Sequence, residues 1–300
     1  MARATANGLE LEYDVFGDEN GEPLLLIMGL GGQMTRWPVS LIDKLTARGF
    51  RVIRFDNRDV GLSQKLDAAG PPDIPAIIQA LGEGKKPPAA YTLDDMAADA
   101  VGLLDALKIA RAHIVGASMG GMIAQLVAAD YPDRVLSLTS IMSTTGAPDL
   151  ARATPEAMAV LNDRGPDPLT DFEGFLTHSV KGSRVIGSPA YPADEAELRE
   201  QAAAYYRRCY YPVGFLRQYA AVMASPERRT RLKNVAAPTV VVHGDADPLV
   251  PLAGGRDTAQ HIAGAELDII SGMGHDLPAP LYDRIVAAIV RAAERAKAAA

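Results

Sequence analysis

The chain has 300 residues, of which 48% are hydrophobic and 22% charged, a balance typical of folded globular proteins rather than disordered or collagen-like ones. Its net charge is −7 and no basic cluster stands out, which argues against a nucleic-acid partner. The single cysteine, Cys209, excludes an intramolecular disulfide. Apolar runs far shorter than the roughly 20 residues of a membrane span, and an N-terminus without an apolar signal core, predict a cytoplasmic protein with no membrane insertion.

Short apolar runs alternate with helical patterns along the chain. An antiparallel hairpin is expected over 9–15, followed by buried strands at 24–28, 51–55, 112–115, 135–141, 239–243 and 266–270. Helices are expected at 92–108, where Thr92 and Asp95 resemble a capping box, and at 119–129 and 281–299. Near-continuous apolar character is typical of parallel strands covered on both faces. The alternation predicts an α/β fold with a mostly parallel central sheet flanked by helices.

Two stretches interrupt this alternation. Residues 64–90 are rich in proline and glycine and are expected to form a long loop with one short helix. Residues 145–237 contain helical patterns and no convincing strand, although they lie between two sheet strands. We therefore expect residues 1–144 and 238–300 to form a core domain and 145–237 to form a helical cap inserted into it.

The candidate nucleophile is Ser118, within the sequence Gly-Ala-Ser-Met-Gly at 116–120. A strand pattern precedes this motif and a helical pattern follows it, as in the sharp turn that lifts a serine hydroxyl above a sheet. Gly116 and Gly120 provide the room that such a turn needs, and the helix N-terminus adds backbone N–H donors. The alternative is a glycine-rich turn that only packs a helix against a strand.

A serine nucleophile needs a base, and His275 is the best placed of the five histidines. It follows the glycine-rich residues 271–274 in the loop after the last predicted strand, where α/β sheets hold their sites. His243 ends a buried strand and is expected to orient a turn, and His113 is expected in the core. His178 and His261 are expected to be solvated or structural.

The acid that orients the histidine is expected to be Asp247, in the loop after the preceding strand. Asp245 lies in the same loop and is expected to be a turn residue. Asp276 is adjacent to His275, and a sequence neighbour rarely reaches the Nδ1 atom of its own histidine. The chain order of Ser118, Asp247 and His275 is the order typical of the strand–turn–helix arrangement.

Acyl transfer also needs two N–H groups aimed at the developing oxyanion. Met119, directly after the nucleophile, supplies one. The glycine-rich stretch at 28–32 is expected to supply the other, from Leu30 or else Gly31, and Gly29 and Gly31 let its backbone approach the substrate. The alternative for this stretch is an ordinary strand-to-helix turn.

These motifs together resemble the α/β-hydrolase superfamily over nearly the whole chain outside the cap. The resemblance lies in residues 27–32, Trp37-Pro38, residues 51–63, the Ser118 motif and the loops of Asp247 and His275. More narrowly, Met28-Gly29 and residues 57–61 (Asn-Arg-Asp-Val-Gly) resemble the aclacinomycin methylesterase type. Many relatives carry His-Gly at 28–29 and Arg-Gly at 58–59. In relatives, residues 56–63 form a structural turn, so the resemblance implies no chemistry there.

The expected cap contains a run of aromatic residues: Tyr205, Tyr206, Tyr210, Tyr211, Phe215 and Tyr219. They can line an apolar substrate pocket, for which Tyr206 and Tyr210 are candidates, or pack the cap against the core. Arg207 and Arg208, in their midst, are expected to be solvated.

The predicted function is that of a serine hydrolase acting on a small-molecule carboxylic ester. A serine at 118 argues against the dehalogenases and epoxide hydrolases of the family, whose nucleophile is a carboxylate. No metal-ligand or phosphate-binding motif is present, so no cofactor is implied. The same three residues support opening of lactones, cleavage of carbon–carbon bonds and perhydrolysis. A non-catalytic ligand receptor is a further alternative, although such receptors typically lose one of the three.

Overall fold

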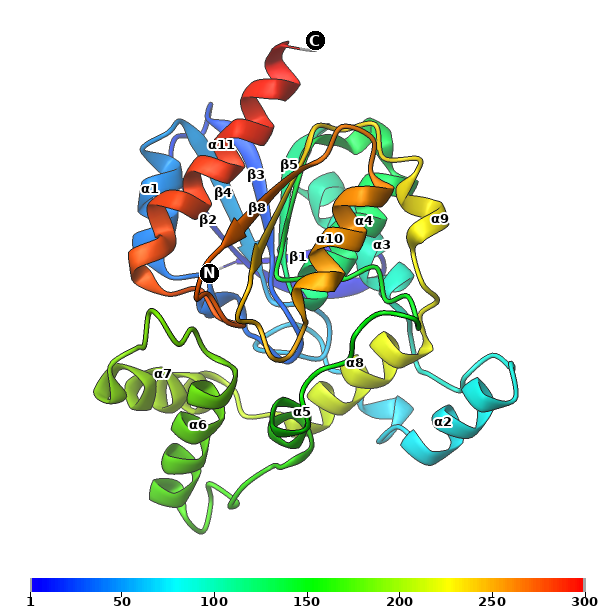
Figure 1. Ribbon diagram of the computed structural model, residues 1–300, viewed down its shortest axis with the longest axis vertical. Coiled ribbons are helices and arrows are strands. Elements are labelled where there is room, and N and C mark those ends of the chain that lie inside the picture. Colours follow the sequence, from blue (N-terminus) through cyan, green and yellow to red (C-terminus); the bar gives the residue numbers. More distant parts are fainter. Residues whose placement is uncertain (1, 299–300) are drawn as a thin grey trace.

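The computed structural model describes residues 2–298 and places a mostly parallel eight-stranded sheet between layers of helices (Figure 1). The strands lie in the order β1-β2-β4-β3-β5-β6-β7-β8. Their bounds are β1 (Ala2–Ala6), β2 (Leu9–Phe16), β3 (Glu22–Ile27), β4 (Phe50–Phe55), β5 (Ala112–Ala117), β6 (Val135–Ile141), β7 (Thr239–Gly244) and β8 (Glu266–Ile270). Strand β2 is antiparallel to β1 and β4, and the other neighbours are parallel. The predicted α/β fold and its six strands are confirmed, but the strand at 266–270 is not buried as expected, because β8 lies at the edge of the sheet and only its Ile270 is buried.

The prediction of a hairpin within 9–15 was wrong, because these residues form one strand. Strand β2 pairs with β1, and the turn between them is Asn7-Gly8. Both turn residues have positive φ, 49° and 77°, as the tight turns that suit a twisted hairpin require. The hairpin is therefore shifted toward the N-terminus, and its second strand joins the main sheet through β4.

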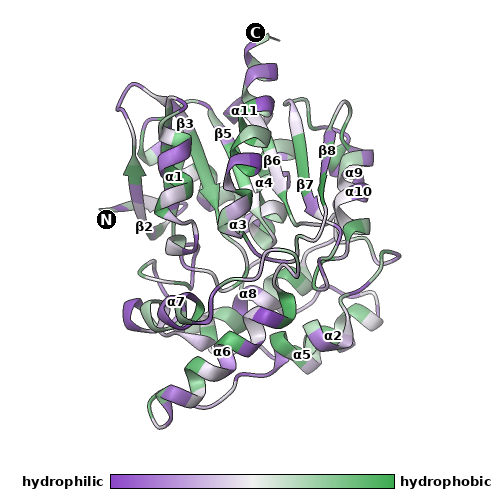
Figure 2. Ribbon diagram, turned by 60° about the vertical axis from the view of Figure 1, so that its left-hand side comes forward, coloured by the Kyte–Doolittle hydropathy of each residue, from purple (hydrophilic) through white to green (hydrophobic). Residues whose placement is uncertain are grey.

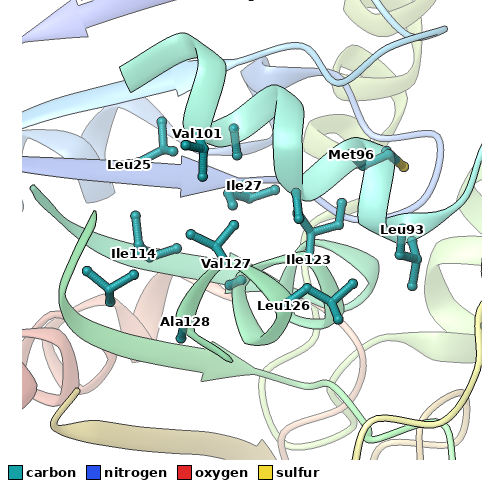
Figure 3. Close-up of a cluster of buried hydrophobic side chains, with 14 of the residues drawn as sticks. Leu25, Ile27, Leu93, Met96, Val101, Ile114, Ile123, Leu126, Val127 and Ala128 are labelled. Carbon is teal, nitrogen blue, oxygen red and sulfur yellow. The ribbon is translucent and has the colours of Figure 1, made fainter. Parts of the chain in front are cut away.

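Alternate side chains of the central strands face opposite layers of helices. Leu25 and Ile27 of β3 pack with Ile114 of β5 against α3 (Leu93–Ala106) and α4 (Met119–Asp130) (Figure 3). Leu24 and Leu26 pack on the other face against α1 (Val39–Thr46) and α11 (Tyr282–Ala298). This burial on both faces explains why the strands read as continuous apolar runs.

The predicted helices are also observed. Helix α3 begins after Thr92, whose side chain forms a capping box with Asp95. Helices α4 and α11 match the expected ranges within two residues, and α10 (Leu252–His261) packs beside β7. The long loop at 64–90 contains the short helix α2 (Ile74–Gly82), as expected.

The chain between β6 and β7, residues 142–238, is here called the β6–β7 segment. Within it the structure forms helices and no strand. Its helices are α5 (Pro155–Asn162), α6 (Phe172–Ile186), α7 (Glu195–Arg208), α8 (Pro212–Ala224) and α9 (Arg229–Leu232). Helices α5 to α8 lie together at the end of the sheet toward which β3 and β8 point, with α2 beside them (Figures 1 and 2). None of the helices in residues 2–298 is long and apolar enough to cross a membrane.

His113 illustrates how the core controls protonation. It lies inside β5, as expected for a core residue, and its Nδ1 is 2.8 Å from Ser137 Oγ on β6. Burial lowers the pKa of His113 to about 4. The imidazole is therefore neutral in the folded chain at pH 7.

This burial predicts a pH-dependent stability. In the unfolded chain His113 titrates near pH 6.5, so between pH 6.5 and 4 the unfolded state binds a proton that the folded state does not. The free energy of unfolding must fall as the pH drops through this window, by up to about 3 kcal/mol from this group. In urea denaturation, wild type should lose its stability advantage over His113→Gln between pH 7 and pH 4. Parallel pH profiles of the two proteins would contradict the assignment.

Candidate active site

Ser118 occupies the turn between β5 and α4, with φ 57° and ψ −122°. This backbone conformation is strained for a residue with a side chain. It is possible because the surrounding glycines pack backbone against backbone. A Cβ on Gly116 would lie 2.0 Å from the oxygen of Gly120, and one on Gly120 would lie 2.0 Å from the oxygen of Ile27. The turn leaves Ser118 partly exposed at the C-terminal end of the central strand.

His275 lies between Ser118 and Asp247. Its Nε2 is 2.9 Å from Ser118 Oγ, and its Nδ1 is 2.7 Å from Asp247 Oδ2. A carboxylate accepts only, so Nδ1 carries a proton and donates it to Asp247, which leaves Nε2 free to accept from the serine hydroxyl. Both ion-pairing side chains are shielded, with 7% of the His275 side chain and none of the Asp247 side chain exposed.

Asp247 is held by the loop in which it lies. Its Oδ1 accepts hydrogen bonds from the N–H groups of Leu249 and Val250, at 2.9 and 2.8 Å. Its neighbour Asp245 accepts from the Gly272 N–H instead, so it joins the loop after β7 to the loop after β8. Asp245 is thus a turn residue, as expected, and the two loops that carry Asp247 and His275 are fixed relative to each other.

His243 lies beneath the Asp247 loop. Its Nε2 is 2.8 Å from the oxygen of Val250, so it orients this turn as expected. Burial lowers the pKa of His243, which keeps the ring neutral. A neutral His243 leaves His275 as the hydrogen-bond partner of Asp247 at 2.7 Å.

Asp276, next to His275 in sequence, turns away from it. Its carboxylate accepts from the hydroxyl of Ser188 in the β6–β7 segment, and burial raises its pKa. The same hydroxyl accepts from the Gly274 N–H at 2.8 Å, and the His275 N–H donates to the oxygen of Ile186 at 2.7 Å. The loop that carries His275 is therefore bound to the β6–β7 segment.

The glycine-rich loop at 28–32 runs beside Ser118. A Cβ on Gly29 would lie 3.0 Å from the Cβ of Ser118, so a side chain at this position would crowd the serine. The N–H of Gly31 donates to Gln218 Oε1 at 2.8 Å, whereas the N–H of Leu30 has no acceptor within residues 2–298. Met119 opens α4, where first-turn N–H groups have no acceptor within the helix.

Two groups of aromatic residues lie in the β6–β7 segment. Tyr206 and Tyr210 contact Phe175 of α6, with ring centroids 5.9 Å away in both cases, and form a cluster between α6 and α7. Phe215 and Tyr219 stack on each other along α8 at 6.4 Å. Phe215 also contacts the loop at 28–32, because a Cβ on Gly31 would lie 2.6 Å from its ring.

The expectation that Arg208 is solvated was wrong. Its guanidinium lies 2.7 Å from Asp56 Oδ2 and from Gln33 Oε1, and only 12% of the side chain is exposed. Arg207, by contrast, is 62% exposed and pairs with Glu200 on the helix surface. Asp56, in the turn directly after β4, has no exposed side-chain surface, and its buried charge draws Arg208 inward.

Sequence reasoning missed Gln218 as a residue that touches the site, and it named Tyr205 only as one of the aromatic run. Gln218 accepts from the Gly31 N–H, and the Tyr205 hydroxyl donates to the oxygen of Gly31 at 2.6 Å. No sequence pattern pointed to Gln218, because a single glutamine in a predicted helix is usually exposed to solvent. Within residues 2–298 no group of three or more His, Cys, Asp or Glu side chains is arranged to hold a metal ion.

Comparisons with known proteins agree with one another, as three of the matches illustrate. A family model described as alpha/beta hydrolase fold matches residues 22–278. Rhodomycin D methylesterase DnrP of Streptomyces peucetius is 30% identical, and the match covers 95% of each chain. The solved structure of the meta-cleavage product hydrolase CumD from Pseudomonas fluorescens IP01 is similar with a TM-score of 0.75 at 21% identity, and it covers 99% of this chain and 98% of that one.

The strained backbone at Ser118 predicts an unusual ranking of two variants. Both Ser118→Gly and Ser118→Ala remove the hydroxyl, but glycine adopts a positive φ without strain. The relief of about 1–3 kcal/mol exceeds the entropic cost of glycine in the unfolded chain. Ser118→Gly should therefore be more stable than Ser118→Ala by about 1 kcal/mol in urea denaturation. Equal stabilities would mean that the turn is not strained.

Proposed function

The chain belongs to the alpha/beta hydrolase family, and on this premise we propose that it is a serine hydrolase that cleaves carboxylic esters through an acyl-enzyme intermediate. The observation that carries the proposal is the continuous hydrogen-bond path from Ser118 through His275 to Asp247. This path gives the serine an adjacent base and gives the base a buried carboxylate that orients it.

In the acylation step, Ser118 Oγ bonds to the ester carbonyl carbon while His275 Nε2 takes the hydroxyl proton. The carbonyl electron pair moves onto the oxygen and forms a tetrahedral oxyanion. The oxyanion then collapses, the bond to the alcohol oxygen breaks, and His275 returns the proton to the leaving alcohol. Asp247 stabilises the protonated imidazole between these two transfers and remains ionised itself.

Deacylation repeats the sequence with water. His275 Nε2 removes a proton from water as its oxygen bonds to the acyl carbon, and the proton then passes to Ser118 Oγ as the acid leaves. The N–H groups of Leu30 and Met119 are the donors we assign to the oxyanion in both steps. The free Leu30 N–H and the close contact of Gly29 with Ser118 support this assignment.

We assign residues 145–237 the role of a cap over the site, and residues 1–144 and 238–300 the role of the hydrolase core. Helices α5 to α8 lie at the end of the sheet that carries Ser118, which supports this division (Figure 1). Contacts from the cap to the loops of Gly31 and His275 support it further. Tyr206 and Tyr210 stay candidates for the outer wall of the substrate pocket.

A small-molecule ester is the substrate class that the rhodomycin D methylesterase relative supports, since its match covers 95% of both chains. A lactone is an ester closed into a ring and would undergo the same acylation. Hydrolysis of a panel of methyl esters, p-nitrophenyl esters and lactones by the wild-type protein would rank these substrates.

Removal of the nucleophile should abolish turnover. Ser118→Ala should lower kcat for p-nitrophenyl esters by at least about 10³-fold, because only substrate binding and the oxyanion donors remain. Wild type should release p-nitrophenol in a burst equal to the concentration of sites when deacylation is slower than acylation. Turnover retained in a folded Ser118→Ala protein would refute the proposed mechanism.

The two aspartates of one loop offer a matched pair. Asp247→Asn should lower kcat on the order of 10³-fold or more, because an amide no longer favours the reactive tautomer of His275. Asp245→Asn keeps an oxygen acceptor for the Gly272 N–H and should change kcat by less than about threefold, as an exposed turn position. Steady-state kinetics on the best ester checks both. Equal effects of the two substitutions would show that Asp247 acts only through the structure of its loop.

A further inference from the structure

We propose that helices α7 and α8 complete the oxyanion site, with Gln218 and Tyr205 as the residues that position the loop at 28–32. The inference rests on the proposed function, because it concerns the Leu30 N–H as a donor to the oxyanion. Neither Gln218 nor Tyr205 is proposed to contact the substrate. Each acts through the backbone of the loop.

One hydrogen bond from the core and one within the loop hold its first half. Asn57 Nδ2 donates to the oxygen of Met28 at 2.9 Å, which fixes the peptide group before Gly29. The Gly32 N–H donates to the oxygen of Gly29 at 3.0 Å. This oxygen belongs to the same peptide group as the Leu30 N–H. In a trans peptide the N–H points opposite to the oxygen, so this bond directs the Leu30 N–H away from the turn.

Two hydrogen bonds from the β6–β7 segment hold the second half. Gln218 Oε1 accepts from the Gly31 N–H at 2.8 Å, and the Tyr205 hydroxyl donates to the oxygen of Gly31 at 2.6 Å. Gly31 has a φ of +65°, and the ring of Phe215 covers it. The peptide groups on both sides of Gly31 are therefore fixed by side chains that lie more than 170 residues away in sequence.

Gln218 suits this task because both ends of its amide are used. While Oε1 accepts from Gly31, Nε2 donates to the oxygen of Arg58 at 2.8 Å, and no surface of the residue is exposed. An amide bound at both ends cannot rotate without leaving a buried polar group unpaired, which costs about 1–3 kcal/mol. Burial also raises the pKa of Tyr205 to about 12, so its hydroxyl stays protonated and remains a donor.

A buried ion pair sets the position of Gln218. The adjacent Arg217 binds Asp59 with two hydrogen bonds, at 2.7 and 2.8 Å, and both side chains are almost fully buried. Position 59 is where the sequence departs from the Arg-Gly of many relatives. Asp59 has a φ of +67°, a conformation that suits glycine, and its carboxylate is the group that a glycine could not provide. The cost of the strained residue is offset by a charged contact with α8.

A second buried ion pair sets the position of Tyr205. Arg208, one turn farther along α7, binds Asp56 and Gln33. Gln33 Nε2 in turn donates to the oxygens of Tyr205 and Cys209, at 2.9 and 2.8 Å. Helix α7 is thus anchored to the core at its C-terminal end, and α8 is anchored near its middle. Displacement of either helix would release Gly31 and, through it, Leu30.

The experiment compares Tyr205→Phe and Gln218→Leu with Ser225→Ala. Ser225 follows α8, and its hydroxyl accepts from the Leu93 N–H of the core at 2.9 Å, so its loss removes a comparable contact far from the loop. The readouts are kcat and KM on the best p-nitrophenyl ester, burst amplitude, thermal stability and the Ki of an alkyl trifluoromethyl ketone of matching chain length. The ketone accepts Ser118 Oγ at its carbonyl carbon, His275 takes the proton, and the resulting oxyanion occupies the same donors as the transition state.

We expect kcat per active site to fall about 10-fold or more in Gln218→Leu and severalfold in Tyr205→Phe, with KM within about twofold of wild type. The Ki of the ketone should rise by the same factor as kcat/KM falls, because both depend on the oxyanion donors. Ser225→Ala should lower thermal stability and leave kcat and Ki unchanged.

The proposal is overturned if Tyr205→Phe and Gln218→Leu lower the burst amplitude alone, with kcat per active site and Ki unchanged, since that outcome is a loss of folded protein. It is also overturned if Ser225→Ala raises Ki as much as they do. Should Gln218→Leu fail to fold, Tyr205→Phe decides, because it removes one hydroxyl only. An inactive wild type that does not bind the ketone would instead refute the proposed ester hydrolysis itself.

Discussion

The backbone at Ser118 is the constraint on which the rest of the site depends. Ser118 adopts φ 57° there, and Gly116 and Gly120 make this turn possible because their backbone packs directly against Gly120 and Ile27. This strained residue lies where β5 ends and α4 begins. The Ser118 hydroxyl therefore projects beyond the sheet, beside the N–H groups of the first turn of α4, which have no acceptor within the helix. The other parts of the site lie around the Ser118 hydroxyl. The loop at 28–32 approaches it through a glycine, and His275 approaches it from the loop after β8.

Buried charges connect the loops around this site to helices α7 and α8. Asp56 and Asp59 lie in the turn after β4, which carries no chemistry of its own in the proposed mechanism, yet both are fully buried and each binds an arginine of the β6–β7 segment. A buried carboxylate without such a partner would be strongly destabilising, so these residues specify one position for α7 and α8. Arg58, in the same turn, forms a buried ion pair with Asp99 of α3 and so links the turn to the core.

The β6–β7 segment therefore contributes to the site in two ways. Its α7 and α8 contact the loop beside the proposed nucleophile. Ile186, the last residue of α6, and Ser188 just after it bind the loop of His275. The aromatic cluster between α6 and α7 lies outside these contacts. The part of the segment that contacts both loops is therefore bound to the backbone on either side of Ser118.

The sequence alone determined the alternation of strands and helices, the nature of the Ser118 turn and the candidates Asp247 and His275. These features depend on short-range periodicity and on the residue types that a turn or strand end tolerates, so they are legible in a single chain. The sequence misplaced the N-terminal hairpin and indicated a solvated Arg208. Strand pairing and the burial of a charge both depend on neighbours that are distant in sequence. Only the tertiary structure decided that His275 lies within hydrogen-bond distance of Ser118 and that Gln218 binds Gly31. Such contacts join residues more than 150 positions apart, and their energies come from packing and burial that no local pattern encodes.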